Sequence, residues 1–252
     1  MKRFVQSPNL PRRCAAILYG ARYSDFLAES LNKLGIEGLP LPDNPYLEKR
    51  LAAHADLSVF HAGGESVFLA PYLKGSAFAE LLISFGATIQ IPDCSQGERY
   101  PQDAQFNLCM LGEHVICNEK TSAREIVDFL TNLSRFKPLS CRQGYSRCSV
   151  CVVDSQSIIT ADRGIALRAR EAGLDVLLIQ PGTIRLDGYA YGFIGGASFK
   201  IASDKLAFTG RLSGHPDQDR ILRFLASHGV EPVYLTQFPA FDIGSAVPLL
   251  EN

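Results

Sequence analysis

The chain has 252 residues, of which 46% are hydrophobic and 20% are charged, and its net charge of −1 argues against nucleic acid or an anionic membrane surface as a partner. No apolar run approaches the roughly 18 to 20 residues that span a bilayer, so we expect no membrane association. Seven cysteines, an odd number in a chain of this length, favour reduced thiols and a cytoplasmic location.

A pattern of strand, tight turn, strand, amphipathic helix and strand recurs along the chain. Its first complete copy covers residues 55–92, where two strand-like runs flank Gly63-Gly64 and apolar residues at helical spacing follow. Further copies cover residues 103–140, 145–180 and 189–236. The tight turns begin at Gly63, Gly112, Asp154 and Ser203, at intervals of 49, 42 and 49 residues. An internal repeat of this size indicates an array of similar modules.

A fifth module is divided between the two ends of the chain. Residues 240–252 supply a first strand, predicted over 241–247, and residues 14–42 supply a second strand, a helix and a last strand. A C-terminal strand that pairs with an N-terminal strand would close a ring and leave no free sheet edge. We therefore predict one α/β domain over residues 1–252, a propeller of five strand-strand-helix-strand modules around a pseudo-fivefold axis.

Ring geometry predicts where a ligand binds. The first strand of every module should line the axis, so polar side chains near the strand starts should converge on one mouth of a central channel. The polar side chains near the strand starts are Asp56, His61, Asp103, Tyr145, Arg147, Asp187, Tyr189, Tyr191, Asp242 and Ser245. Of these, we expect Asp103, Asp187, Asp242, Tyr145, Arg147, Tyr189 and Tyr191 to bind a ligand. Three carboxylates would suit a small cationic molecule with a guanidino or amino group. Each aspartate could equally cap a turn at a strand entrance.

Five such modules in a closed ring resemble the pentein fold. The resemblance is strongest to a bacterial branch, on Tyr100-Pro101-Gln102-Asp103, Gly144-Tyr145 and Phe241-Asp242-Ile243-Gly244-Ser245 at the module starts. Members include guanidino-group-modifying enzymes and a non-enzymatic ribosome anti-association factor. The resemblance implies a central channel for a small polar molecule, and we expect no cofactor.

The catalytic motif of the pentein enzymes is not matched. Those enzymes attack a guanidinium carbon with a Cys near the C-terminus, and a His acts as general acid and base. Their C-terminal strand carries a pattern like Gly-Gly-Asn-x-His-Cys, and Asp242, Gly244 and Ser245 fall here at the Asn, His and Cys positions. A hydroxyl is a far poorer nucleophile than a thiolate unless a base lies beside it. The sequence therefore leaves open whether the chain is an enzyme.

Three residues are candidates for catalysis by a displaced site: His61 as general base, and Cys148 or Ser245 as nucleophile. His61 could instead be a turn histidine, and Cys148 a buried inert cysteine. Cys148 and Cys151 lie three residues apart in a strand predicted over 148–153, where they would face opposite sides. Since the matched pairs of a zinc site are also missing, we predict no metal site.

Three functions fit these patterns. The first is binding of a small polar, cationic molecule in the central channel. The second is an amidino-group hydrolase or transferase, similar to a deiminase, whose nucleophile has moved. The third is a protein-interaction module that resembles the anti-association factor.

Overall fold

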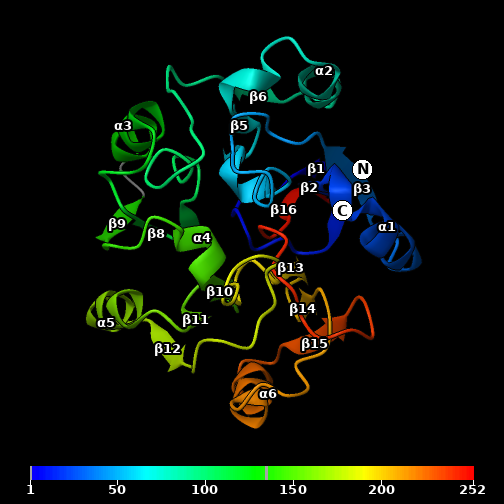
Figure 1. The fold of residues 1–252 in the computed structure, drawn as a ribbon, viewed down its shortest axis with the longest axis vertical. Coiled ribbons are helices and arrows are strands. Elements are labelled where there is room, and N and C mark those ends of the chain that lie inside the picture. Colours follow the sequence, from blue (N-terminus) through cyan, green and yellow to red (C-terminus); the bar gives the residue numbers. More distant parts are fainter. Residues whose placement is uncertain (1, 134–135) are drawn as a thin grey trace.

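The chain forms a ring of five modules around a common axis, which confirms the predicted architecture. The computed structural model describes residues 2–133 and 136–252 and contains five small sheets of three or four strands. Viewed down the axis, helices α1 (Ser24–Lys33), α2 (Ala77–Ser84), α3 (Arg124–Asn132), α5 (Arg163–Glu171) and α6 (Gln218–Ser227) lie at the rim (Figure 1).

Every module contains three strands and a rim helix in the same order. The inner strands are β4 (Val59–Gly63), β7 (Cys109–Leu111), β10 (Val150–Val152), β13 (Ser198–Ala202) and β16 (Val247–Glu251). The middle strands are β5 (Ser66–Leu69), β8 (His114–Cys117), β11 (Ser157–Thr160), β14 (Lys205–Phe208) and β2 (Cys14–Gly20). The outer strands are β6 (Thr88–Gln90), β9 (Lys137–Ser140), β12 (Asp175–Leu178), β15 (Glu231–Tyr234) and β3 (Glu37–Leu41).

The sheets have a uniform topology. Each middle strand runs antiparallel to its inner strand and parallel to its outer strand, as in the β10-β11-β12 sheet. The rim helix provides the crossover that two parallel neighbours require. Short helical turns complete the chain: η1 (Ala21–Tyr23), η2 (Ala55–Leu57), η3 (Pro71–Leu73) and α4 (Ser146–Ser149).

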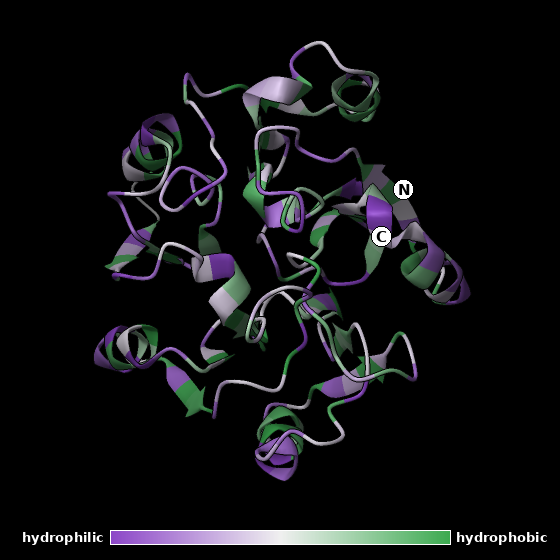
Figure 2. Cartoon of the chain, viewed as in Figure 1, coloured by the Kyte–Doolittle hydropathy of each residue, from purple (hydrophilic) through white to green (hydrophobic). Residues whose placement is uncertain are grey.

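The hydrophobic core lies mainly between modules. One cluster joins Phe68 of β5 to Ile126 of α3, and another joins Ile116 of β8 to Ile165 of α5. The rim helices are amphipathic, and Figure 2 shows hydrophilic residues on the outward side of α6, opposite its buried Leu225. Because each cluster needs residues from two neighbouring modules, the modules stabilise one another around the ring.

The two ends of the chain close the ring, as predicted. Strand β16 pairs antiparallel with β2, and on its other side with the short strand β1 (Arg3–Phe4). The resulting sheet has the order β1-β16-β2-β3. Its inner strand therefore comes from the C-terminus and its other three strands from the N-terminus.

A closed circle of hydrogen bonds joins the chain segments just before the five inner strands; we call it the axial belt. Asp56 N donates to the carbonyl of Gly244, and the next residue, Ser245, donates from its N to the carbonyl of Gly196. Gly196 N donates to the carbonyl of Cys148, and Cys148 N donates to the side-chain oxygen of Asn107. The Asn107 amide closes the circle by donating to the carbonyl of Asp56. The donor–acceptor distances range from 2.8 to 3.4 Å. The belt fixes the residues that face the axis.

Two predictions of local structure were wrong for a shared reason. Residues 148–149 belong to the helical turn α4 instead of a strand, and β10 begins at Val150. Residues 241–246 precede the last inner strand, which begins at Val247. In both places the backbone forms a hydrogen bond of the axial belt with a neighbouring module before it enters its own sheet.

The N-terminal residues 5–10 fill the end of the axis at which the inner strands finish. Val5 accepts a hydrogen bond from the backbone of Gly64, and the side chain of Asn9 donates to the Met110 carbonyl. The opposite end, where the inner strands begin, is the mouth of the ring. Within the part of the chain that the structure describes, none of the helices is long and apolar enough to cross a membrane.

Candidate functional site

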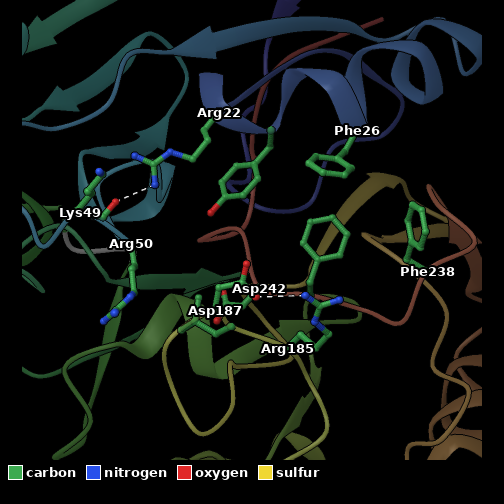
Figure 3. A pocket seen from close by; sticks show the side chains of 11 residues that line it. Arg22, Phe26, Lys49, Arg50, Arg185, Asp187, Phe238 and Asp242 are labelled. Atoms are coloured by element: carbon green, nitrogen blue, oxygen red, sulfur yellow. Dashed lines mark hydrogen bonds and ion pairs between the residues drawn. The ribbon is translucent and has the colours of Figure 1, made fainter.

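A pocket of about 610 Å³ lies at the mouth of the ring, a volume typical of small-molecule sites (Figure 3). We call it the mouth pocket. Residues from four parts of the chain line it: Arg22, Tyr23, Phe26, Lys49, Arg50, Arg185, Leu186, Asp187, Phe238, Phe241 and Asp242. It therefore exists only when the ring is closed.

Basic side chains gather on one side of the mouth pocket, where Arg22, Lys49 and Arg50 lie near one another (Figure 3). Arg22 is ion-paired with Asp43 and also donates to the carbonyl of Lys49 at 2.7 Å. The ammonium group of Lys49 forms no ion pair with any described residue. This side of the pocket offers donors to an anionic group.

Two carboxylates lie on the opposite side of the pocket. Asp187 is paired with Arg185 at 3.2 Å and its side chain is 90% exposed. Asp242, in contrast, is buried and accepts hydrogen bonds from the backbone of Phe193 and of Gly244, both at 2.8 Å. Because each carboxylate oxygen of Asp242 has a second acceptor site, the group can still bind a donor on a ligand.

Aromatic rings form the rest of the mouth pocket. Phe26 and Phe241 meet edge to face, with their centroids 5.7 Å apart, and Phe238 lies beside them with 61% of its surface exposed. The pocket thus combines charged groups of both signs with an apolar wall.

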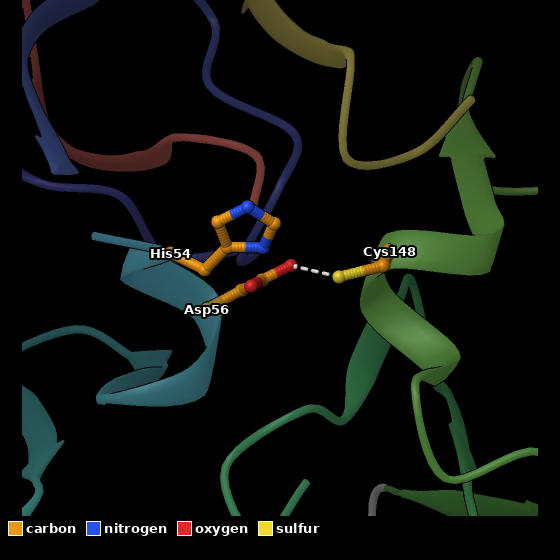
Figure 4. Close-up of side chains that lie close together, drawn as sticks. All are labelled: His54, Asp56 and Cys148. Carbon is orange, nitrogen blue, oxygen red and sulfur yellow. Dashed lines mark hydrogen bonds between the residues drawn. The ribbon is translucent and has the colours of Figure 1, made fainter. Parts of the chain in front are cut away.

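Close to Asp242, a compact buried cluster brings together His54, Asp56 and Cys148 (Figure 4). Their potential ligand atoms all lie within 4.8 Å of one another. The Cys148 thiol donates to Oδ2 of Asp56 at 2.9 Å, and the Asn107 amide donates to Sγ of Cys148 at 3.3 Å. We call these three residues the axial cluster.

Burial sets the protonation of the axial cluster. Burial raises the pKa of Asp56 to about 7, and it holds the pKa of Cys148 well above its ordinary value, with the Asp56 charge acting in the same direction. Burial also lowers the pKa of His54. At neutral pH Cys148 is therefore a thiol and His54 a neutral imidazole.

The imidazole of His54 occupies the space beside Gly244. A Cβ added at Gly244 would lie 2.2 Å from Cβ of His54, and Gly244 has a positive φ of 68°. Gly244 is the position at which the resemblance to the enzymes of this fold places a histidine. In this chain His54, from the connection between the fifth and first modules, fills that space.

Asp103 and Tyr145 form a pair of their own. The Tyr145 hydroxyl donates to Oδ2 of Asp103 at 2.5 Å, and burial raises the pKa of both groups. Asp187 and Asp242 line the mouth pocket together, whereas Asp103 is not among its lining residues. The three predicted carboxylates are therefore brought together only in part.

Tyr189 and Tyr191 lie in the loop that follows Asp187, and both are 43% exposed. The Tyr189 hydroxyl donates to Glu48 at 3.3 Å, and the Tyr191 ring meets Phe193 edge to face. Neither tyrosine lines the mouth pocket, and Tyr191 lines a separate, smaller pocket of about 130 Å³.

Arg147 and Ser245 are buried and bonded to the protein itself. The Arg147 guanidinium donates to Oδ1 of Asn9 at 3.1 Å and to the Val150 carbonyl at 3.2 Å. The Ser245 hydroxyl donates to the carbonyl of Ser198 at 3.1 Å. Neither residue lines the mouth pocket.

The sequence argument against metal binding rested on a strand that does not form at Cys148. Cys148 lies in α4, whereas Cys151 lies in β10 and contributes to the core between two modules. The two sulfurs therefore belong to different environments. The groups near Cys148 are Asp56 at the start of the first module and His54 in the connection before it, which the spacing of cysteines does not reveal.

His61 is buried between two backbone carbonyls, those of Pro248 at 3.2 Å and Gly64 at 2.8 Å. Burial lowers its pKa, so the folded protein binds fewer protons than the unfolded chain in mild acid. The stability contributed by the neutral ring is complete above the unfolded pKa of about 6.5 and is lost as the pH falls.

We expect His61→Gln to make the free energy of unfolding less dependent on pH. Between about pH 6.5 and pH 5 the slope should fall by up to ~1.4 kcal/mol per pH unit, the value for one proton. Urea unfolding at a series of pH values measures both slopes. Equal slopes in the two proteins would contradict the lowered pKa.

The sequence analysis missed His54 and the basic residues of the mouth pocket as site residues, whereas it placed Asp56 among the polar side chains at the strand starts. Asp56 carried a usable signal, because it stands just before an inner strand, as Asn107 and Cys148 do. Arg22, Lys49 and Arg50 follow other elements, and only the folded ring shows that they share a pocket.

Several solved structures have the same ring, and three of them show the extent of the likeness. A putative peptidyl-arginine deiminase has 12% identity and a TM-score of 0.58, with 100% of this chain and 99% of that chain covered. A DDAH from Pseudomonas aeruginosa in complex with citrulline has 10% identity and a TM-score of 0.56, with 88% and 92% covered. The amidinotransferase SxtG from Microseira wollei has 10% identity and a TM-score of 0.56, with 95% and 96% covered. At these identities the likeness shows the pentein fold alone.

No curated protein matches the sequence. One family model matches residues 19–247, which is most of the chain. The chain belongs to that family, a family of unknown function (DUF6873).

Proposed function

We propose that the mouth pocket binds a small amino-acid-like molecule that carries a carboxylate at one end and a guanidino, ureido or amino group at the other. The observation that carries this proposal is the division of charge across one pocket, with Arg22 and Lys49 on one side and Asp242 on the other. A purely cationic ligand would meet the basic side unfavourably, because like charges repel at short range.

The two ends of the ligand have separate partners. Arg22 and Lys49 are the donors for its carboxylate, and charge-assisted bonds of this kind are among the stronger hydrogen bonds in proteins. Asp242 is the acceptor for the guanidino or ureido end. The ring of Phe241 covers the apolar stem between them. Citrulline, the molecule in the DDAH complex, has this division of groups.

The proposal concerns binding and leaves out turnover. Catalysis of the pentein type needs an accessible nucleophile, and the Ser245 hydroxyl donates to backbone carbonyls. The Cys148 thiol is buried and protonated. Neither group lines the mouth pocket, so the proposed binding does not depend on them.

Thermal-shift assays and calorimetry with L-arginine, L-citrulline and agmatine test the proposal, because agmatine lacks the carboxylate. A bound ligand at about a hundred times its dissociation constant adds ~2.7 kcal/mol of apparent stability. We expect this for the two amino acids and a much weaker effect for agmatine.

Lys49→Ala should weaken binding of L-arginine about 10- to 100-fold, the equivalent of one charged hydrogen bond. Lys74→Ala removes the same charge from an exposed site outside the pocket and should leave the affinity unchanged. Equal affinity for agmatine and L-arginine, or equal losses in the two variants, would overturn the proposal.

A further inference from the structure

The axial cluster contains buried polar atoms that the protein leaves without partners. Nε2 of His54 and Oδ1 of Asp56 have no hydrogen-bond partner among the described residues. Both side chains are only 2% exposed. Buried polar groups in folded proteins are nearly always satisfied, and an orphaned one costs about 1–3 kcal/mol. Two such atoms in one cluster indicate that something else binds there.

The donor types in the cluster are those of a zinc site. Imidazole nitrogen, thiolate sulfur and carboxylate oxygen are the three ligand types that Zn²⁺ takes in proteins. A sulfur and a nitrogen ligand also disfavour Mg²⁺ and Ca²⁺, which prefer oxygen. Figure 4 shows the side chains of His54, Asp56 and Cys148 pointing toward one another from two segments of the chain.

The surroundings also suit a metal ion. The amide of Asn107 faces Sγ of Cys148, and its oxygen accepts from the backbone of Arg147 at 2.8 Å and of Cys148 at 3.1 Å. This fixes the amide so that its N–H group points at the sulfur, as an outer-shell partner of a metal-bound thiolate would.

We infer that His54, Asp56 and Cys148 form a binding site for one divalent transition-metal ion of the zinc type. The ion takes the imidazole, one carboxylate oxygen and the thiolate as ligands, and the thiol proton passes to solvent. Three protein ligands leave a fourth position for a small molecule, the arrangement typical of reactive zinc sites. None of the three residues lines the mouth pocket, so the inference does not depend on its proposed ligand.

Cobalt(II) titration of the chelator-treated full-length protein tests the inference. We expect one equivalent to bind with a sulfur-to-cobalt charge-transfer band in the near ultraviolet, which Zn²⁺ then displaces. Metal analysis after Zn²⁺ loading and dialysis should give one zinc per chain. Wild-type protein that shows no such band, or no tightly bound zinc, overturns the inference.

A matched pair of cysteine variants identifies the sulfur ligand. Cys148→Ala should abolish the band and weaken Zn²⁺ binding. Loss of a residue that only orients a metal ligand costs about 10- to 100-fold in affinity, and we expect a larger loss here. Cys109→Ala removes an equally buried thiol outside the cluster and should retain both. A band that survives in Cys148→Ala would overturn the site. If that variant does not fold, Asp56→Asn should weaken binding comparably, and unchanged affinity there counts against the inference.

Discussion

Gly244→Ala is expected to lower the free energy of unfolding by about 2–5 kcal/mol, from a left-handed backbone penalty of ~1–2 kcal/mol and an overpacking cost of ~1–3 kcal/mol. Gly244 has a φ of 68°, and an added Cβ would lie 2.2 Å from Cβ and 2.5 Å from Cα of His54. Because one of these atoms belongs to the backbone, a side-chain rotation cannot relieve the contact. Chemical denaturation with far-ultraviolet circular dichroism measures the change.

Gly35→Ala is the matched control for this prediction. Gly35 has a similar φ of 72°, but no atom lies within 4 Å of the position of an added Cβ. Its cost should be limited to the backbone term of about 1–2 kcal/mol. Equal losses in the two variants would show that His54 does not occupy the space beside Gly244.

Arg147→Ala should destabilise the protein by about 3–5 kcal/mol, the size of effect seen when one partner of a buried polar network is removed. The guanidinium is buried and donates to the side chain of Asn9 and to the carbonyls of Val150, Gly195 and Ser198. Alanine would remove these hydrogen bonds and open a cavity on the axis. Urea unfolding measures the loss.

Arg168→Ala provides the comparison for Arg147→Ala. Arg168 lies on the outward side of α5, exposed and paired with Glu171 at 2.9 Å, and such surface pairs contribute about 0–1 kcal/mol. We therefore expect a small change there. A loss at Arg147 as small as the one at Arg168 would mean that the buried guanidinium does not hold the modules together.

The sequence predicts the ring well because its signals are repeated and local. Tight turns such as Gly63-Gly64 recur with the module, and α5 ends in a glycine at the expected position, Gly173. Closure of the ring by β16 and β2 follows from the missing parts of one module. The turns and the helix end rest on backbone preferences that neighbouring residues determine, and the repeat then implies the closure.

The site was harder to predict because its geometry depends on segments outside the repeat. His54 belongs to the connection between the fifth and first modules, and Lys49 to the same connection. Their neighbours Gly244 and Asp242 are about 190 residues away in the chain. Asp242 could be placed on the axis by counting modules. Of its two backbone hydrogen-bond donors, Gly244 is local, but Phe193 lies 49 residues earlier and no local pattern predicts that contact.

The two proposals assign different roles to neighbouring regions of one axis. The mouth pocket takes an amino-acid-like molecule, and the axial cluster takes a metal ion in the interior of the ring. Asp242 lies between them, since it lines the pocket and its charge acts on Asp56, Cys148 and His54. A ligand bound against Asp242 would therefore lie close to the metal.

The central claim is that the closed ring creates a ligand pocket at its mouth with basic groups on one side and a carboxylate on the other. A crystal structure of the protein grown with L-arginine tests this claim most directly. Our account predicts density for the amino acid in the mouth pocket, with its carboxylate toward Arg22 and Lys49 and its guanidinium toward Asp242. Density for the ligand at another surface, or in the pocket with its ends reversed, would contradict the account.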